Sequence, residues 1–444
     1  MKRGPVGGRW YQNAVFYELR VRSFADGNGD GVGDFKGLIS RLGYLKGLGV
    51  DCLWLLPIHP SPLKDDGYDV ADYYSVHPDY GTLADFKAFL REAHRLGLRV
   101  ILDLVLNHTS DRCAWFQDSR RPGSSKREWY VWSPAKTRYA GVPVIFEDFE
   151  DSNWTWDRAA GAYYWHRFFR SQPDLNFENP EVREEMLKVA EFWLKLGVDG
   201  FRLDAVPYLF EKEGTRCQHL PRTHAYLRSL RRLVEERYPG RLLLAEAGGR
   251  PKEIFQYFGR APGDECHMAF HFPLAAELLL ALADGSGACV RRAFRSLPRP
   301  PRECAWGLFL RNHDGVNLSF LTPGERDRVV RAYAPKPGML LHDEPRRRLA
   351  PMLGNDARKL RLLHALLLSL PGSPVLYYGD EIGMGEDLSL PDRFGLRTPM
   401  RWPDARRQEG DPASMLSWLK RALEIRRSHP AFARGSLDFL PGGG

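Results

Sequence analysis

The sequence has few cysteines, and their arrangement does not indicate a metal or redox site. Its 444 residues include six cysteines, and no two of them form a Cys-x-x-Cys pair or a zinc-binding spacing. Residues 1–5 carry charge with no apolar run behind it, which argues against a secretory signal peptide. We therefore expect reduced thiols in a cytoplasmic protein.

Long apolar runs and glycine-rich phosphate loops are also lacking. The two most apolar segments, around residues 274–283 and 362–370, are broken by Glu277 and Pro371, so neither can span a bilayer. The formal net charge is +8, but basic and acidic residues alternate along most of the chain, which favours a solvated, arginine-rich surface over nucleic-acid binding. No phosphate-binding glycine motif follows a strand-like run. We expect no membrane partner, no nucleic acid and no organic cofactor, and the sequence leaves a homo-oligomer open.

The residues that are present describe an ordinary globular α/β chain, with 43% hydrophobic and 27% charged residues. Short apolar runs alternate with segments of helical periodicity, the pattern of a parallel sheet covered by helices. Residues 179–197 give the clearest helix, with Asn179 as its cap, Pro180 in its first turn and Gly197 at its end. Eight strand-like runs can be counted, which predicts a (β/α)8 TIM barrel; they lie near residues 15, 52, 101, 201, 243, 268, 308 and 376.

One connection is much longer than the others. Residues 108–179 separate the third strand from the next helix and hold six of the twelve tryptophans. A connection of this length is usually functional, so we expect a small aromatic-rich subdomain beside the barrel. Its aromatic rings could contact sugar rings, but most of them are needed to pack the subdomain itself. The expected organisation is barrel over residues 1–107, inserted subdomain over 108–179, and barrel again over 180–444.

The run at residues 200–204 places a cation beside a carboxylate. Successive side chains of a strand point to opposite faces, so Arg202 and Asp204 share one face and Phe201 and Leu203 the other. A neighbouring cation favours the ionised carboxylate, which suits a nucleophile. A purely structural Arg–Asp pair explains the same five residues, and it is the simpler interpretation of this stretch alone.

Polar residues at the ends of other strands favour the catalytic interpretation. Glu246 ends the fifth predicted strand, residues 312–314 follow the seventh, and residues 107–108 follow the third. The carboxyl ends of barrel strands share one rim, so these groups converge with Asp204. Two carboxyl groups on one rim suit retaining glycoside chemistry, with Asp204 as nucleophile and Glu246 as acid. Three other side chains would hold sugar hydroxyls and stabilise the transition state: His108, His313 and Asp314.

An acidic, glycine-rich loop follows the first strand. Oxygen-bearing side chains recur at alternate positions, as in a calcium loop; they are Asp26, Asn28, Asp30 and Asp34. An EF-hand would need a bidentate glutamate at the twelfth loop position, where this chain has Gly37. A plain turn rich in Asp and Gly remains the alternative to a calcium loop.

These motifs together resemble the α-amylase superfamily of glycoside hydrolases. The superfamily's sequence blocks stand at residues 67–69, 103–108, 200–204, 245–246 and 311–314. Within the superfamily the chain is similar to the trehalose synthases (maltose α-D-glucosyltransferases), on the strength of residues 164–169, 172–180, 264–272 and 370–384. The resemblance covers about residues 10–440.

The resemblance implies specific roles. Asp204 would be the nucleophile, Glu246 the acid/base and Asp314 the transition-state stabiliser. The first sugar subsite would be lined by Tyr68, Asp69, His108, Arg202 and His313. A second structural Ca²⁺ site would be formed by Asn107, Asp174, Glu211 and the backbone carbonyls of Tyr208 and Leu209.

The implied reaction is the isomerisation of maltose to trehalose. It proceeds by retaining intramolecular α-glucosyl transfer through a covalent glucosyl-Asp204 intermediate, with side hydrolysis to glucose. An α-glucosidase that hydrolyses short α-glucosides is the nearest alternative. A barrel that only binds a ligand is a more distant one, because all three carboxylates are present.

Three departures from the family pattern bear on that reaction. Ala-Gly-Gly-Arg-Pro at residues 247–251 replaces the family's Ala-Asn-Gln-Trp-Pro, and Gly315 replaces the Glu that follows Asp314. Both changes remove side chains from the rim, so we expect more hydrolysis than in the relatives. The loop after residue 402 is short, and a C-terminal β-sandwich, which would begin near residues 442–444, is expected to be absent.

Overall fold

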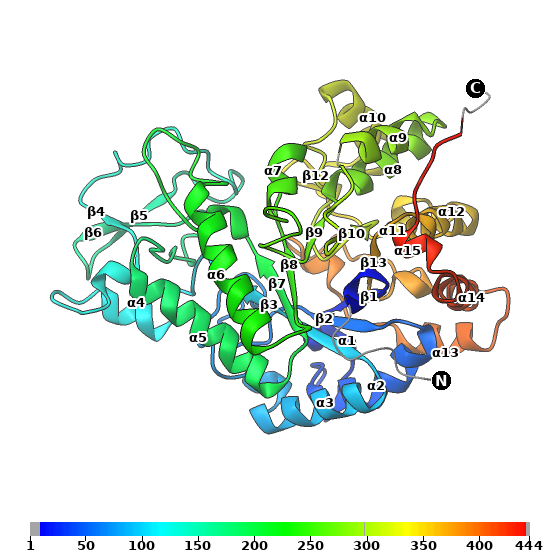
Figure 1. Cartoon of the computed structure of the whole chain (residues 1–444), viewed down its shortest axis with the longest axis horizontal. Coiled ribbons are helices and arrows are strands. Elements are labelled where there is room, and N and C mark those ends of the chain that lie inside the picture. Colours follow the sequence, from blue (N-terminus) through cyan, green and yellow to red (C-terminus); the bar gives the residue numbers. More distant parts are fainter. Residues whose placement is uncertain (1–8, 297, 441–444) are drawn as a thin grey trace.

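The computed structural model describes residues 9–296 and 298–440, and its centre is a closed barrel of eight parallel strands (Figure 1). The predicted (β/α)8 barrel is confirmed, with a strand at each of the eight predicted positions. Around the barrel the order is β1-β13-β10-β9-β8-β7-β3-β2. The strands are β1 (Phe16–Leu19), β2 (Cys52–Leu55), β3 (Arg99–Val105), β7 (Gly200–Asp204), β8 (Leu242–Ala245), β9 (Met268–Phe270), β10 (Ala305–Phe309) and β13 (Ser373–Tyr377).

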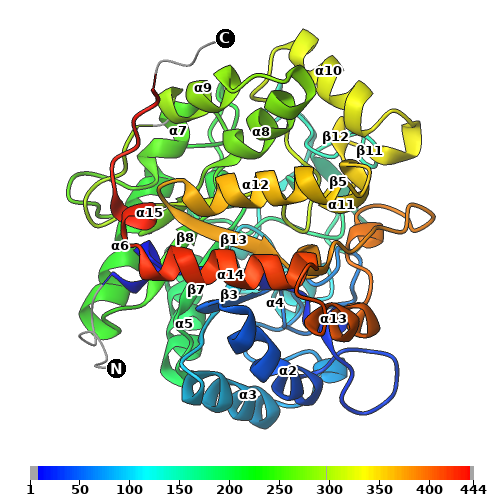
Figure 2. The ribbon, with the colours of Figure 1, turned by 90° about the vertical axis from the view of Figure 1, so that its right-hand side faces the viewer.

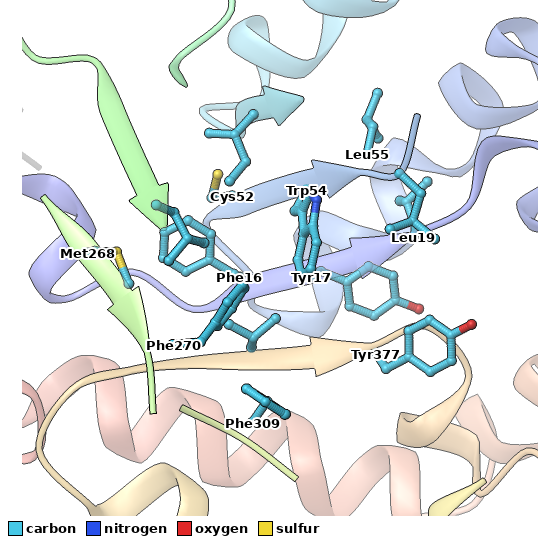
Figure 3. Packing of buried hydrophobic residues seen from close by; sticks show 14 of the residues in the cluster. Phe16, Tyr17, Leu19, Cys52, Trp54, Leu55, Met268, Phe270, Phe309 and Tyr377 are labelled. Atoms are coloured by element: carbon cyan, nitrogen blue, oxygen red, sulfur yellow. The ribbon is translucent and has the colours of Figure 1, made fainter. Parts of the chain in front are cut away.

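Large aromatic side chains fill the interior of the barrel (Figure 3). The rings of Trp54 on β2 and Phe270 on β9 lie 5.5 Å apart, although their strands are not neighbours. The ring of Phe309 on β10 lies a further 5.5 Å from Phe270. The barrel is therefore a packed core rather than a channel. This core supports the polar groups at the carboxyl ends of the strands.

Helices surround the barrel, and Figure 2 shows α12 and α14 side by side over β13. The predicted helix at 180–196 is α5: the Asn179 side chain accepts a hydrogen bond from the amide of Glu181, and Gly197 ends the helix at φ 109°. The helices are α1 (Val21–Phe24), α2 (Phe35–Leu48), α3 (Leu83–Arg95), α4 (Ala114–Ser119), α5 (Pro180–Leu196), α6 (Pro221–Arg237), α7 (Pro251–Gln256), α8 (Phe272–Asp284), α9 (Ala288–Ser296), α10 (Pro323–Tyr333), α11 (Leu349–Met352), α12 (Ala357–Ser369), α13 (Trp402–Glu409), α14 (Met415–Ser428) and α15 (Ala431–Arg434).

The long connection between β3 and α5 contains α4 and a small sheet of its own. Its three antiparallel strands, β4 (Trp132–Ser133), β5 (Trp154–Asp157) and β6 (Ala162–Trp165), lie to one side of the barrel (Figure 1). The rings of Trp154 and Trp165 lie 5.0 Å apart and both side chains are buried. Many of the aromatic residues of this segment therefore pack its own core. The exact limits of the subdomain stay a prediction.

A short hairpin between α10 and α11 was not predicted from the sequence. It pairs β11 (Leu340–Leu341) with β12 (Glu344–Pro345) through a two-residue turn, His342 and Asp343, at φ 50° and 62° (Figure 2). Positive φ at both central residues is the geometry of a tight hairpin turn. This hairpin lies at the rim of the barrel and contributes to the site described below.

All six cysteines are buried free thiols, in agreement with their expected reduced state. Within the described part of the chain, no helix combines the length and apolarity that crossing a membrane requires. The predictions that concern residues 1–5 and 442–444 fall outside the described residues.

Candidate active site

Strand β7 presents Arg202 and Asp204 on the same face, as its alternation predicts. The Arg202 guanidinium is fully buried, and its Nη1 donates to Asp204 Oδ1 at 2.5 Å and to Asp103 Oδ1 at 2.8 Å. Its Nη2 forms an ion pair with Glu246, which follows β8. One guanidinium therefore holds both predicted reacting carboxyl groups, because β7 and β8 are neighbours in the barrel.

Burial raises the pKa values of both carboxyl groups. The pKa of Asp204 rises to about 6, with Arg202 opposing the effect of burial. The pKa of Glu246 also rises to about 6, and the nearby Asp204 charge adds to the rise while Arg202 opposes it. The Glu246 Oε2 accepts a hydrogen bond of 2.9 Å from the amide of Ala205, a residue at φ 48°. Two coupled carboxyls near pH 6 allow one to be ionised while the other keeps its proton.

Asp314, beyond the end of β10, is surrounded by cations. Its carboxylate contacts His313 Nε2 at 3.1 Å and accepts hydrogen bonds of 2.9 Å from each of Arg393 and Arg397. Burial would raise the pKa of Asp314, but these cations, His313 first, hold it well below its usual value. Asp314 therefore stays ionised throughout the working pH range.

Two further predicted residues complete the charged floor of the site. Tyr68 Oη donates to Asp103 Oδ2 at 3.0 Å, lies 2.8 Å from His313 Nε2, and its ring stacks on that imidazole. Burial disfavours a charged His313, but Asp314 and Glu18 outweigh burial and raise its pKa to about 9. His108 differs, since burial lowers its pKa to about 3, and its Nε2 lies 3.2 Å from Gln172 Nε2. One imidazole is thus charged and the other neutral.

These side chains border one cavity of about 340 Å³, within the size range of small-ligand pockets. Three parts of the chain form its wall: the barrel rim, the inserted segment and the β11–β12 hairpin. The rim contributes Tyr68, His108, Asp204, Glu246, His313 and Asp314, the insert contributes Ile145, Phe146 and Phe168, and the hairpin contributes Leu341, His342 and Glu344.

One predicted sugar-binding residue lies outside this cavity. The Asp69 carboxylate accepts hydrogen bonds from the Ser61 hydroxyl at 2.7 Å and from two backbone amides, so it stabilises its own loop. The nearby Asp65 lines the cavity instead, paired with Arg393 at 2.5 Å. Sequence reasoning missed both members of this pair. Asp65 belongs to a loop without periodicity, and no local motif marks Arg393.

The first predicted calcium loop uses its oxygens within the chain. Asp26 accepts hydrogen bonds from three backbone amides, and Asn28 Nδ2 donates to Asp30 Oδ2 at 3.0 Å. Asp34 accepts from the amide of Gly37 and caps α2. This pattern is that of an Asp- and Gly-rich turn, the alternative interpretation, and calcium at this loop stays a prediction.

The second predicted calcium set shows a different pattern. Asn107, Asp174 and Glu211 are buried, and each has one side-chain oxygen without a hydrogen-bond partner: Oδ1, Oδ2 and Oε1, respectively. Among the described residues no three His, Cys, Asp or Glu side chains group as a metal site, because this set contains only two carboxylates and one amide. Unpaired buried oxygens of carboxylate and amide groups are the donors that Ca²⁺ prefers.

Residues 19–335 match the model of the alpha amylase catalytic domain family. The chain is 48% identical to the trehalose synthase/amylase of Mycolicibacterium smegmatis, over 99% of this chain and 79% of that protein. It is also 48% identical to the trehalose synthase of Pimelobacter sp., over 98% of this chain and 82% of that protein. A trehalose synthase of Thermus thermophilus is equally similar, although the match spans only 48% of its length.

Two solved structures show the same architecture. An alpha-glucosyl transfer enzyme superposes with a TM-score of 0.77 at 31% identity, covering 98% of this chain and 87% of the other. The trehalulose synthase of Pseudomonas mesoacidophila superposes with a TM-score of 0.78 at 28% identity, covering 97% and 86%.

Proposed function

The chain belongs to the alpha-amylase family, and from that membership we propose that it isomerises maltose to trehalose by intramolecular glucosyl transfer. The observation that carries the proposal is its 48% identity, over nearly its whole length, to trehalose synthases from several organisms. The cavity supports it, since its carboxyl groups are those that a retaining glycosyl transfer needs. The substrate is accordingly a disaccharide with an α-linked glucosyl unit.

The first step breaks the glycosidic bond of maltose. The Asp204 carboxylate attacks the anomeric carbon of the non-reducing glucosyl unit, while the Glu246 carboxyl donates its proton to the departing oxygen. Free glucose and a β-linked glucosyl ester of Asp204 result. Arg202 binds both groups, so each is held in position before the substrate arrives. Asp314, held ionised, stabilises the positive charge that develops on the sugar ring.

The second step forms the new bond. The freed glucose turns so that its own anomeric hydroxyl faces the ester, and the Glu246 carboxylate accepts the proton of that hydroxyl. The hydroxyl oxygen attacks the anomeric carbon and Asp204 leaves as a carboxylate. Two successive inversions restore the α configuration at the transferred carbon and give trehalose. Water that enters first gives glucose instead, which is the α-glucosidase outcome.

A structural Ca²⁺ is the second proposal for this site's surroundings. Asn107, Asp174 and Glu211 would hold it with their unpaired oxygens, together with the carbonyls of Tyr208 and Leu209. The ion would link the end of β3, the inserted segment and the loop after β7. It takes no part in the bond changes described above. The buried free thiols agree with a further proposal, that the protein works in the cytoplasm.

The test is incubation of the purified protein with maltose and separation of the products by chromatography. We expect trehalose as the main product, with glucose as the minor one. Covalent trapping with a fluorinated glucosyl fluoride, followed by peptide mass spectrometry, should label Asp204, and Asp204→Asn should abolish both labelling and turnover. Glucose alone would establish the hydrolase, and a protein that binds maltose without turnover would contradict both enzymatic readings.

A further inference from the structure

The space beside Asp314 is occupied although residue 315 is a glycine. In the family pattern described above, a Glu follows the aspartate at this place. A side chain at Gly315 would put its Cβ 2.7 Å from Glu344 Cβ and 2.8 Å from Glu344 Oε2. The backbone at Gly315 has no positive φ that would demand glycine. The absence of a side chain there therefore makes room for the side chain of Glu344.

Glu344 reaches this place from a distant part of the chain. It is the first residue of β12, opposite Leu341 of β11. The amide of Val316 donates to the carbonyl of Pro345 at 3.2 Å, which joins the hairpin directly to the segment after Asp314. A carboxyl group is thus delivered next to Asp314 from residue 344 rather than from residue 315.

The hairpin is held from its other side by the inserted segment. The imidazole of His342 stacks on Phe146 with ring centres 4.9 Å apart and planes 17° from parallel. The backbone amide of His342 donates to Asp148 Oδ2 at 3.1 Å. Since Phe146, His342 and Glu344 all line the cavity, the hairpin closes the side of the site opposite the barrel floor.

The chemistry of the Glu344 carboxyl suits a sugar hydroxyl. Burial raises its pKa to about 8, the Asp314 charge adds to the rise, and Arg393 opposes it. At neutral pH the group is therefore mostly a carboxylic acid, which donates one hydrogen bond and accepts others. Its own strand pairing uses only the backbone, so the side chain is available to a ligand in the cavity.

We propose that Glu344 binds the freed glucose during the turn between the two bonds, as the acceptor-site residue that decides between transfer and hydrolysis. The proposal rests on the proposed isomerase function and names a residue for it that the family pattern places elsewhere. Glu344 is a specificity-determining residue and takes no proton in either step. By holding the glucose against the ester, it gives the sugar an advantage over water.

The test is an exchange of the two positions, read as the trehalose-to-glucose ratio formed from maltose. We expect Glu344→Gly to lower this ratio by about tenfold, equivalent to roughly 1.4 kcal/mol between the two routes. Gly315→Glu alone should lower turnover, because its side chain meets Glu344. The double variant Gly315→Glu/Glu344→Gly should recover most of the parent ratio.

Controls separate this proposal from others. Asp343→Asn is the matched control, because Asp343 is an exposed acid on the same turn and should leave the ratio unchanged. Thermal unfolding of each variant shows that the fold is retained. A ratio in Glu344→Gly equal to that of the parent, with the parent making trehalose, would overturn the role of Glu344. A parent protein that makes no trehalose would overturn the isomerase function itself.

Discussion

Among single residues, Arg202 connects the chemistry most closely to the fold. It binds Asp103, Asp204 and Glu246 with one buried guanidinium, and the ring of Trp54 lies 5.3 Å from its central carbon. A planar, two-pronged cation can contact two carboxyls at once, whereas the single ammonium of a lysine cannot do so with the same geometry.

Arg202→Lys should therefore retain the fold and lose activity. The charge remains, which avoids the large cost of an uncompensated buried acid. We expect kcat/KM for maltose to fall by about 100-fold or more, because one carboxyl loses its fixed position. Steady-state kinetics combined with thermal unfolding checks this, and an unchanged kcat/KM would show that Arg202 has only a structural role.

The pH dependence of activity follows from the two carboxyl groups. Asp204 must be ionised, so activity is lost as the pH falls below its pKa of about 6. Glu246 must carry a proton, so activity is lost as the pH rises above its pKa of about 6. The expected profile of kcat/KM for maltose is a narrow bell centred near pH 6, whose limbs belong to the coupled pair.

The alkaline limb can be assigned separately. Glu246→Gln should be nearly inactive on maltose but should still form the ester from α-glucosyl fluoride, whose leaving group needs no proton. The rate of that first step should keep the acid limb and lose the alkaline one. A persistent alkaline limb would point to another acid.

The rim glycines after Glu246 differ in what they tolerate. A side chain at Gly248 would meet nothing within 4 Å, whereas Gly249 has φ +133° and its Cβ would lie 2.7 Å from His219 Nε2. Gly248→Asn should fold normally and raise the trehalose-to-glucose ratio, since it narrows the entrance for water. Gly249→Gln should lower the melting temperature by several degrees. Product chromatography and calorimetry would check both, and an unaltered ratio in Gly248→Asn would show that this position does not control water.

At the level of secondary structure, the hairpin turn is the weakest link in the wall of the cavity. His342 and Asp343 both have positive φ, which a β-branched residue adopts only under strain. Asp343→Val should cost about 1–3 kcal/mol locally and increase hydrolysis of maltose, whereas Asp343→Gly should preserve the parent ratio. Equal ratios in the two variants would mean that the turn conformation does not affect the site.

The elements also show where sequence reasoning succeeded and where it stopped. The eight strands could be predicted because each is a fully buried apolar run, and α5 because Asn179, Pro180 and Gly197 mark its ends. The hairpin could not, because its strands have two residues each and its His-Asp turn is not a common hairpin signal. Asp204, Glu246 and Asp314 were placed by the rule for strand ends. The partners Asp65 and Arg393 meet only through tertiary folding of loops 328 residues apart.

In the whole molecule, the proposed calcium joins three distant segments. Binding to the folded state alone should stabilise it by about 2.7 kcal/mol at a free Ca²⁺ concentration 100 times Kd. We expect Ca²⁺ to raise the melting temperature and a chelator to lower it. Asp174→Asn should remove most of this effect, and Asp26→Asn, in the exposed loop, should leave it intact. An equal Ca²⁺ response in parent and Asp174→Asn would locate any ion elsewhere.

The crowding between positions 315 and 344 also has a meaning for descent. If relatives carry the acidic side chain at the first position and this chain carries it at the second, the two substitutions are epistatic. The atoms cannot be placed at both positions at once without displacement, since the two Cβ atoms would lie 2.7 Å apart. A lineage that acquired the second acid first passed through a crowded intermediate, and one that lost the first acid first passed through a leaky one. Each route exposes a different ancestral phenotype to selection.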